Sequence, residues 1–168
     1  MKSTFCLILT FVLLLCLCGC EEAAGNGQAT FYYQRIEFDF GSDTGVFVPE
    51  VHDVSGHEGD LRYLLSLYLR GPTDQELILP FPGGTILVEL EETETELTVL
   101  LSSGASMLDS LDLITACGCL AKTCFAISDA QVVHINSLPA VSGQRVETTF
   151  SRDSILLTGN ETLPDATE

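Results

Sequence analysis

The cysteines are the residues of this chain best suited to chemistry, as nucleophiles, redox partners or metal ligands. Cys117 and Cys124 lie seven residues apart in a segment with helical periodicity, which would separate their Cα atoms by ~10.5 Å. A disulfide needs Cα atoms within ~7 Å. Cys117 and Cys119 would point to opposite sides of the helix. We therefore expect three free thiols, with Cys117 and Cys124 acting as small apolar core residues.

Cys119 is the candidate for a reactive thiol. On the expected helix it shares a polar stripe with Asp112 and Lys122, and the lysine charge would lower the pKa of the thiol. An enzyme using this thiol as its nucleophile is one interpretation. The alternative, which we favour, is an exposed cysteine without a chemical role.

Five glutamates at the tip of an expected hairpin form a second candidate site. Glu91, Glu92 and Glu94 occupy the turn, between Glu89 and Glu96. A calcium loop would mix Asp, Asn and Gly at defined positions, and this segment does not. A solvated, self-repelling turn is the simplest interpretation. Weak cation binding and contact with a basic partner are the alternatives, with Glu91, Glu92 and Glu94 as the acidic interaction patch.

The sequence carries no other pattern of catalysis or cofactor binding. His52, His57 and His134 fall in three separate elements and match no zinc-site spacing. No serine stands in a nucleophile-elbow motif, and no glycine-rich phosphate loop occurs. We therefore expect a non-enzymatic protein with no catalytic residue, no cofactor and no metal ion.

The N-terminal segment carries a different cysteine signal. The apolar run Phe5–Leu17 follows a single base, Lys2, and is shorter than the ~20 residues that cross a bilayer. It suits the core of a secretion signal, and the Leu17-Cys18-Gly19-Cys20 sequence at its end resembles the bacterial lipoprotein box. That resemblance implies cleavage before Cys20 and lipid on the Cys20 thiol and amine. We expect the protein at the extracytoplasmic face of the cell membrane, held by this lipid.

Net charge restricts the partners of such a protein. Loss of residues 1–19 from the 168-residue chain would remove one of seven Lys and Arg residues and none of 24 Asp and Glu residues, so the mature formal charge is −18. Phosphate backbones and anionic lipids both repel such a surface. Nucleic acid is therefore excluded as a partner, and the lipid on Cys20 must supply the membrane attachment. Cations or a basic protein face remain compatible.

The first half of the expected domain contains two strands and a helix. Residues 31–40 and 46–54 have strand composition and flank a glycine-containing turn. Ser55 and Glu58 have capping-box spacing before a helix from about Glu58 to Arg70, which Gly71-Pro72 ends. Alternate apolar residues of the first strand share one face: Tyr32, Ile36, Phe38 and Phe40.

The second half contains a hairpin, a helix and further strands. Residues 86–90 and 97–101 alternate as a hairpin with one buried face. A helix follows, with capping-box spacing between Ser106 and Asp109, and strands are expected at 131–136, 145–150 and 154–157. The order β-α-β-β-α-β predicts an α+β fold, a small mixed sheet with two helices packed on one face. The expected domain organisation is a signal peptide (1–19), a lipidated tether (20–29), the domain (30–157) and a polar tail (158–168).

An ordered series of short motifs runs through the expected domain. The most specific are Leu69-Arg70-Gly71-Pro72-Thr73 at the end of the first helix and Pro82-Gly83-Gly84-Thr85 before the hairpin. The series also includes Tyr32-Tyr33, Leu101-Ser102-Ser103 and the stretch from Val132 to Pro139. In this order the motifs resemble the GerMN domain of bacterial sporulation and spore-germination lipoproteins. Departures from the family pattern are the glutamate-rich turn, Leu100 in place of an acidic residue, and Leu138-Pro139 in place of a Gly-Pro-like pair.

The resemblance implies a non-catalytic, lipid-tethered module that joins or stabilises multiprotein envelope assemblies during spore formation or germination. Its expected partners are envelope or sporulation proteins. The alternative is an envelope lipoprotein that binds a small ligand or cation through the acidic hairpin.

Overall fold

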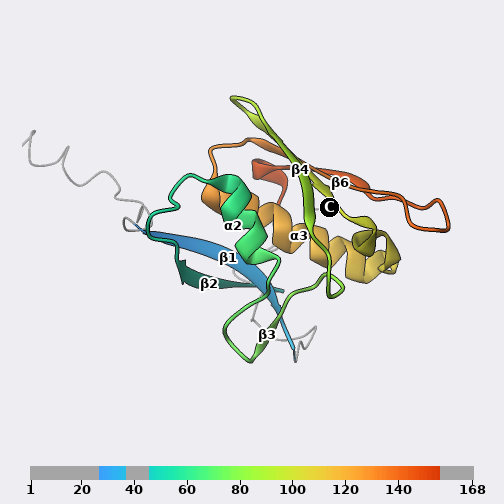
Figure 1. The fold of residues 1–168 in the computed structure, drawn as a ribbon, viewed down its shortest axis with the longest axis horizontal. Helices are drawn as coiled ribbons and strands as arrows, with labels where there is room; N and C mark the ends of the chain where they lie inside the picture. The colour runs from blue at the N-terminus through green and yellow to red at the C-terminus, as the bar shows by residue number, and fades with distance from the viewer. Residues whose placement is uncertain (1–26, 37–45, 156–168) are drawn as a thin grey trace, which may run out of the picture.

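The computed structural model describes residues 27–36 and 46–155 (Figure 1). The expected signal peptide, Cys20, and the polar tail lie outside these residues, as do Phe38 and Phe40 of the first expected strand. The described part contains seven strands and two α-helices, with the 3₁₀ helices η1 (Ser103–Met107) and η2 (Arg152–Ser154).

The first sheet has three antiparallel strands in the order β2-β1-β3. They are β1 (Gln28–Arg35), β2 (Phe47–Asp53) and the two-residue β3 (Leu77–Ile78). The buried face of β1 carries Ala29, Phe31 and Tyr33, and the apolar set that includes Tyr32 and Ile36 lies on the opposite face. The two rings of Phe31 and Tyr33 pack against Tyr68, whereas Ile36 is 56% exposed.

Helix α2 (Leu61–Tyr68) starts later than its sequence predicts. Its N-cap is Asp60, whose carboxylate accepts a hydrogen bond from the Tyr63 N–H at 3.0 Å, and not Ser55. Gly59 has a φ of +80°, a left-handed conformation that cannot continue a right-handed helix, and it delays the start. The expected apolar face is confirmed, because Leu61, Leu64, Leu65 and Tyr68 are buried.

The second sheet is mixed, with the strand order β4-β5-β6-β7. The expected hairpin is formed by β4 (Leu87–Glu92) and β5 (Glu96–Leu101), which pair antiparallel. Strand β6 (Val132–Ser137) runs parallel to β5, and β7 (Glu147–Ser151) pairs antiparallel with β6. A parallel pair needs a long crossover connection, which the second helix provides.

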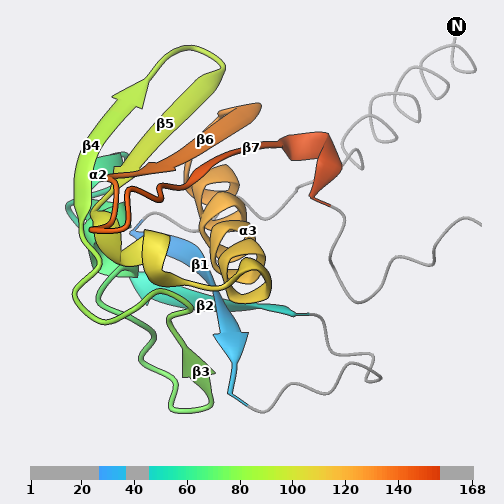
Figure 2. The ribbon, with the colours of Figure 1, turned by 90° about the vertical axis from the view of Figure 1, so that its right-hand side faces the viewer.

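Helix α3 (Ser110–Ile127) lies between the two sheets (Figure 2). Its N-cap is Asp109, whose carboxylate accepts hydrogen bonds from the Leu111 and Asp112 N–H groups at 3.1 and 3.0 Å. The expected cap residue Ser106 lies instead in η1, where its hydroxyl pairs with that of Ser137. By length and composition α3 could cross a membrane, but nine of its residues are buried in this core, which identifies it as the central helix of the domain.

The α+β class is confirmed, but the strands form two sheets instead of one. The expected arrangement placed both helices on one face of a single sheet. Between Ala116 and Phe125, buried residues occur on every side of α3, and such a helix needs cover on opposite faces. The first sheet covers one side and the second sheet the other (Figures 1 and 2).

Candidate interaction surfaces

The cysteines of α3 are free, as expected, but none is a surface thiol. Cys117, Cys119 and Cys124 are all buried, and desolvation raises the pKa of each thiol to about 12. Cys119 has no exposed surface, so its expected place on a polar, solvent-facing stripe is wrong. Lys122 lowers the pKa of Cys119, but this effect is smaller than that of burial. Cys119 lies near Tyr68 of α2, and one turn along its helix the Thr123 hydroxyl accepts a hydrogen bond from the Tyr32 N–H of β1, so this face of α3 is shielded from the water that a reactive thiolate requires.

The Gly-Pro-Thr motif after α2 is tied to strand β2. The Glu50 carboxylate accepts hydrogen bonds from the Thr73 hydroxyl at 2.6 Å, from the Thr73 N–H at 2.9 Å and from the Asp74 N–H at 2.7 Å. The Nε2 atom of His52 lies 2.6 Å from the same carboxylate. Burial alone would raise the pKa of Glu50, but these hydrogen bonds and the His52 charge outweigh it and lower that pKa. The motif therefore positions the loop after α2.

The Pro-Gly-Gly-Thr motif before β4 packs against the chain that leaves β5. The Thr85 side chain is buried and donates a hydrogen bond to the Pro82 carbonyl at 2.8 Å. A Cβ atom at Gly104 would lie 2.7 Å from the Thr85 hydroxyl oxygen, so only glycine allows this approach. The Ser102 hydroxyl also accepts a hydrogen bond from the Ile86 N–H. The two most specific motifs of the family resemblance thus hold loops in place.

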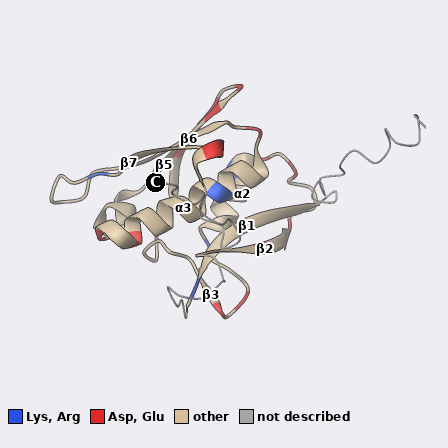
Figure 3. Ribbon diagram, turned by 180° about the vertical axis from the view of Figure 1, so that it is seen from behind, with Lys and Arg blue, Asp and Glu red and all other residues tan. Residues whose placement is uncertain are grey.

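The acidic patch of the hairpin is exposed, but its glutamates are divided between two faces. Glu91 pairs with Thr98 on the outer face of the second sheet, and Glu92 pairs with Leu97, whose side chain points into the core. Glu92 and Glu94 line an open pocket of about 300 Å³ that Asp129 also borders. Figure 3 shows the acidic residues along the projecting β4–β5 hairpin. The patch is a broad negative surface with two sides.

The described residues contain no group of three or more His, Cys, Asp and Glu side chains placed to hold one metal ion. The three histidines have separate surroundings. His52 is buried beside Glu50 and Phe31, while the ring of His57 stacks on Tyr63. His134 lies on the outer face of the second sheet, 3.6 Å from Glu96 and 2.9 Å from the Thr149 hydroxyl.

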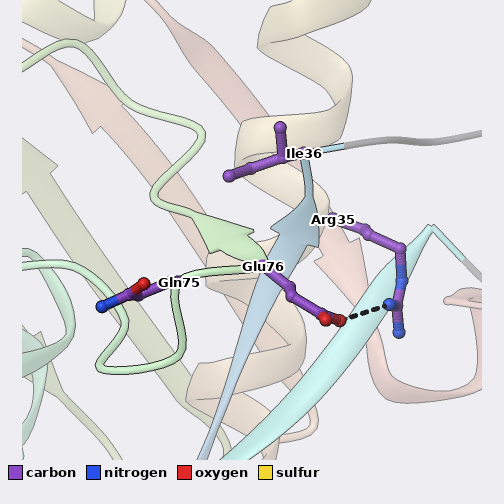
Figure 4. A pocket seen from close by; sticks show the side chains of 4 residues that line it. All are labelled: Arg35, Ile36, Gln75 and Glu76. Atoms are coloured by element: carbon purple, nitrogen blue, oxygen red, sulfur yellow. Dashed lines mark hydrogen bonds and ion pairs between the residues drawn. The ribbon is translucent and has the colours of Figure 1, made fainter.

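A pocket of about 430 Å³ lies at the end of the first sheet, where β1 meets β3. The pocket is lined by Arg35, Ile36, Gln75 and Glu76, and Figure 4 shows the Arg35 guanidinium pointing toward the Glu76 carboxylate. The Arg35 Nη1 atom lies 3.1 Å from the Glu76 Oε2 atom. The ion pair is largely exposed, so it contributes little to stability. Sequence reasoning did not identify this pocket, because β3 is too short to produce a periodic signal.

A second pocket that sequence reasoning missed lies between β1, α3 and η2. Tyr32, Lys122, Phe125 and Arg152 contribute two aromatic rings and two positive charges to its lining. Lys122 and Phe125 are three residues apart and share a helix face, which is the one local signal. Tyr32 and Arg152 come from opposite ends of the domain, and only the tertiary fold brings them together.

No family model matches the chain, and no curated protein matches it. Among solved structures, the chain is similar to the tandem GerMN domains of the sporulation protein GerM from Bacillus subtilis, with a TM-score of 0.56 and 16% identity. The match covers 80% of this chain and 49% of that one, so the chain spans about half the length of the tandem structure. A candidate lipoprotein from Clostridium perfringens also matches, with a TM-score of 0.47, 16% identity and coverage of 76% and 89%.

In this chain α2 and the Gly-Pro-Thr segment that follows it precede β3 and the β4–β5 hairpin, and α3 then connects β5 to a parallel β6. At 16% identity, a match of this kind establishes the fold. The described domain therefore has a GerMN-like fold.

Proposed function

We propose that this protein is a membrane-anchored, extracytoplasmic lipoprotein whose GerMN-like domain is a non-catalytic protein-interaction module in sporulation, germination or envelope assembly. The observation that carries the proposal is the fold match to the tandem GerMN domains of a sporulation protein. The lipoprotein-box sequence that ends at Cys20 supports the anchor. The Gly-Pro-Thr and Pro-Gly-Gly-Thr motifs position loops, which suits a non-catalytic module that binds other proteins.

Genetics and fractionation test this proposal together. Deleting the gene and replacing Cys20 with Ala should both impair sporulation, germination or envelope integrity. In the Cys20→Ala strain the protein should also leave the lipid-modified membrane fraction and take up no labelled palmitate. Normal spores and normal germination in both strains would contradict the sporulation role. Labelling of the Cys20→Ala protein would contradict the anchor.

The acidic hairpin is the proposed partner surface. Glu91, Glu92 and Glu94 are spread over two faces of a projecting hairpin, which suits an extended basic protein surface better than a single cation. Crosslinking followed by pull-down from membranes should recover a partner with the wild-type chain and lose it when all three become Gln. The matched control changes the same three residues to Asp, which keeps the charge and should keep the partner. If the Gln variant recovers the partner as well as the wild type and the Asp variant do, the hairpin is not part of the interface.

The alternative function, cation binding, has its own test. Glu92, Glu94 and Asp129 border one open pocket, although they are not placed to hold one metal ion together, so any binding there would be weak. Calorimetry with calcium would then show heat that Glu92→Gln and Glu94→Gln abolish. Absence of heat at millimolar calcium would contradict cation binding and favour the protein-interaction module.

A further inference from the structure

The pocket between β1, α3 and η2 has an unusual composition for this chain. It is open, holds about 230 Å³, and is lined by Tyr32, Lys122, Phe125, Ala126, Arg152 and Ile155. The mature chain would have six Lys and Arg residues against 24 Asp and Glu residues, and two of the six lie here. Two cations beside aromatic rings in a strongly acidic protein indicate a site for a negatively charged group.

Arg152 is fixed in place before any ligand arrives. Its Nε atom donates to the Ala130 carbonyl at 3.1 Å, and Nη2 donates to the Ser128 and Ala130 carbonyls, each at 2.8 Å. The guanidinium carbon also lies 5.1 Å from the centre of the Phe125 ring. Because these contacts hold the plane of the guanidinium, little conformational entropy remains to be lost when it binds a ligand.

The remaining end of the Arg152 guanidinium is available. Within residues 27–36 and 46–155, its Nη1 atom makes no hydrogen bond, and no carboxylate lies within 4.0 Å of the side chain. Nη1 carries two N–H donors that point away from the bonds to the two carbonyl groups. Arg152 therefore offers directed donors as well as charge.

Lys122 adds a second positive charge to the lining of the pocket. Its Nζ atom lies 5.2 Å from the centre of the Tyr32 ring and 5.5 Å from that of Phe47. The side chains of Tyr32, Phe125 and Ile155 give the pocket apolar walls around the two cations. At ~30 Å³ for each water-sized atom, the pocket has room for a group of only about seven heavy atoms.

We propose that this pocket binds a carboxylate carried on a small apolar body. The carboxylate oxygens would accept hydrogen bonds from Arg152 Nη1 and Lys122 Nζ, and the apolar part would lie against Tyr32 and Phe125. An acidic side chain or a chain terminus with apolar neighbours supplies this chemistry, and so does a free small acid. The inference does not depend on the proposed role in sporulation.

Nuclear magnetic resonance titration of the full-length, ¹⁵N-labelled chain in neutral detergent tests the proposal. The probes are isovalerate and the blocked peptide acetyl-Leu-Glu-Leu-amide, each compared with its uncharged counterpart, isovaleramide or acetyl-Leu-Gln-Leu-amide. At least one acid should shift the amide signals of Tyr32, Lys122 and Arg152, and its uncharged counterpart should not. Binding of the peptide identifies a protein segment as the source, and binding of isovalerate alone identifies a free acid.

Variants separate this pocket from general attraction of anions. Lys122→Gln and Arg152→Lys should each weaken binding about tenfold, the loss expected for one charge-assisted hydrogen bond. Arg145→Gln is the matched control for Lys122→Gln, because it removes the same charge from a side chain that pairs with Glu147 away from the pocket, and it should bind like the wild type. Arg152→Lys keeps the charge and tests the directed guanidinium donors. The spectrum of each free variant shows whether it is folded. Equal shifts with acid and amide, or equal weakening in all three variants, would overturn the proposal.

Discussion

Glu50 and Thr73 lie 23 residues apart, yet both the hydroxyl and the backbone N–H of Thr73 donate to one carboxylate oxygen of Glu50, at 2.6 and 2.9 Å. The contact joins the edge strand β2 to the loop that follows α2. Gly71 makes this possible, because its φ of +97° turns the chain out of the helix and toward β2. The Gly-Pro-Thr motif, which is local in sequence, thus positions Thr73 for its contact with the distant residue Glu50.

Replacing Glu50 with Gln should destabilise the domain, because three donors would then face a neutral amide that can accept from fewer of them. We expect a loss of about 1–3 kcal/mol at pH 7, measured by urea unfolding. Glu76→Gln is the control, since that carboxylate belongs to an exposed pair with Arg35, and its loss should cost less than about 0.5 kcal/mol. Equal losses in the two variants would contradict the role of Glu50.

The contribution of Glu50 should also depend on pH. Its pKa is lowered in the folded protein from the ordinary value of 4.5, so the folded state favours the charged form. The resulting stability is present above the unfolded-state pKa and is lost as the pH falls through the folded-state pKa. The stability gap between wild type and Glu50→Gln should therefore close in acid. A gap that stays constant from neutral pH to well below 4.5 would contradict this.

Gly118 should resist substitution, since it lets Phe47 of β2 approach α3. A Cβ atom there would lie 2.6 Å from the Phe47 Cζ atom. Although alanine favours a helix, Gly118→Ala should lower the unfolding free energy by about 1–3 kcal/mol through overpacking. Gly83→Ala is the control, because nothing lies within 4 Å of a Cβ atom at that position. Adding Phe47→Leu to Gly118→Ala should recover part of the loss, and simple additivity would contradict the contact.

The thiol of Cys119 should react only in the unfolded protein. Its complete burial and a pKa of about 12 leave almost no accessible thiolate near neutral pH. Iodoacetamide at pH 8 should modify Cys117, Cys119 and Cys124 in urea but not in buffer, with the sites located by mass spectrometry. Rapid alkylation of Cys119 in the native protein would contradict its burial and indicate a reactive thiol.

Tyr68 carries a buried hydroxyl that has no hydrogen-bond partner in the described structure. An unsatisfied buried hydroxyl costs free energy, so Tyr68→Phe should leave stability unchanged or raise it by about 1 kcal/mol. Tyr33→Phe is the comparison, because the Tyr33 hydroxyl donates to the Tyr68 carbonyl at 3.3 Å and its removal should cost about 1 kcal/mol. A clear loss of stability in Tyr68→Phe, measured by thermal unfolding, would show that the hydroxyl is satisfied in solution.

Features that depend on nearby residues could be predicted from the sequence. The alternation of Leu97, Val99 and Leu101 predicts β5 because a strand exposes alternate residues to the core, and all three side chains are buried. The helical spacing of Leu61, Leu64, Leu65 and Tyr68 predicts the buried face of α2 for the same kind of reason. The ordered motifs pointed to a GerMN-like domain, and the fold agrees.

Features that depend on distant residues were decided only by the tertiary structure. Cys119 looked exposed because a helical pattern does not show how many elements cover the helix, and in the fold it is buried near Tyr68 of α2. The division of the glutamates between two faces follows from the pairing of Glu91 with Thr98 and of Glu92 with Leu97. Tyr32 and Arg152 line one pocket because β1, α3 and η2 pack together in the fold. Sequence patterns record local periodicity, whereas these contacts depend on how whole sheets and helices pack.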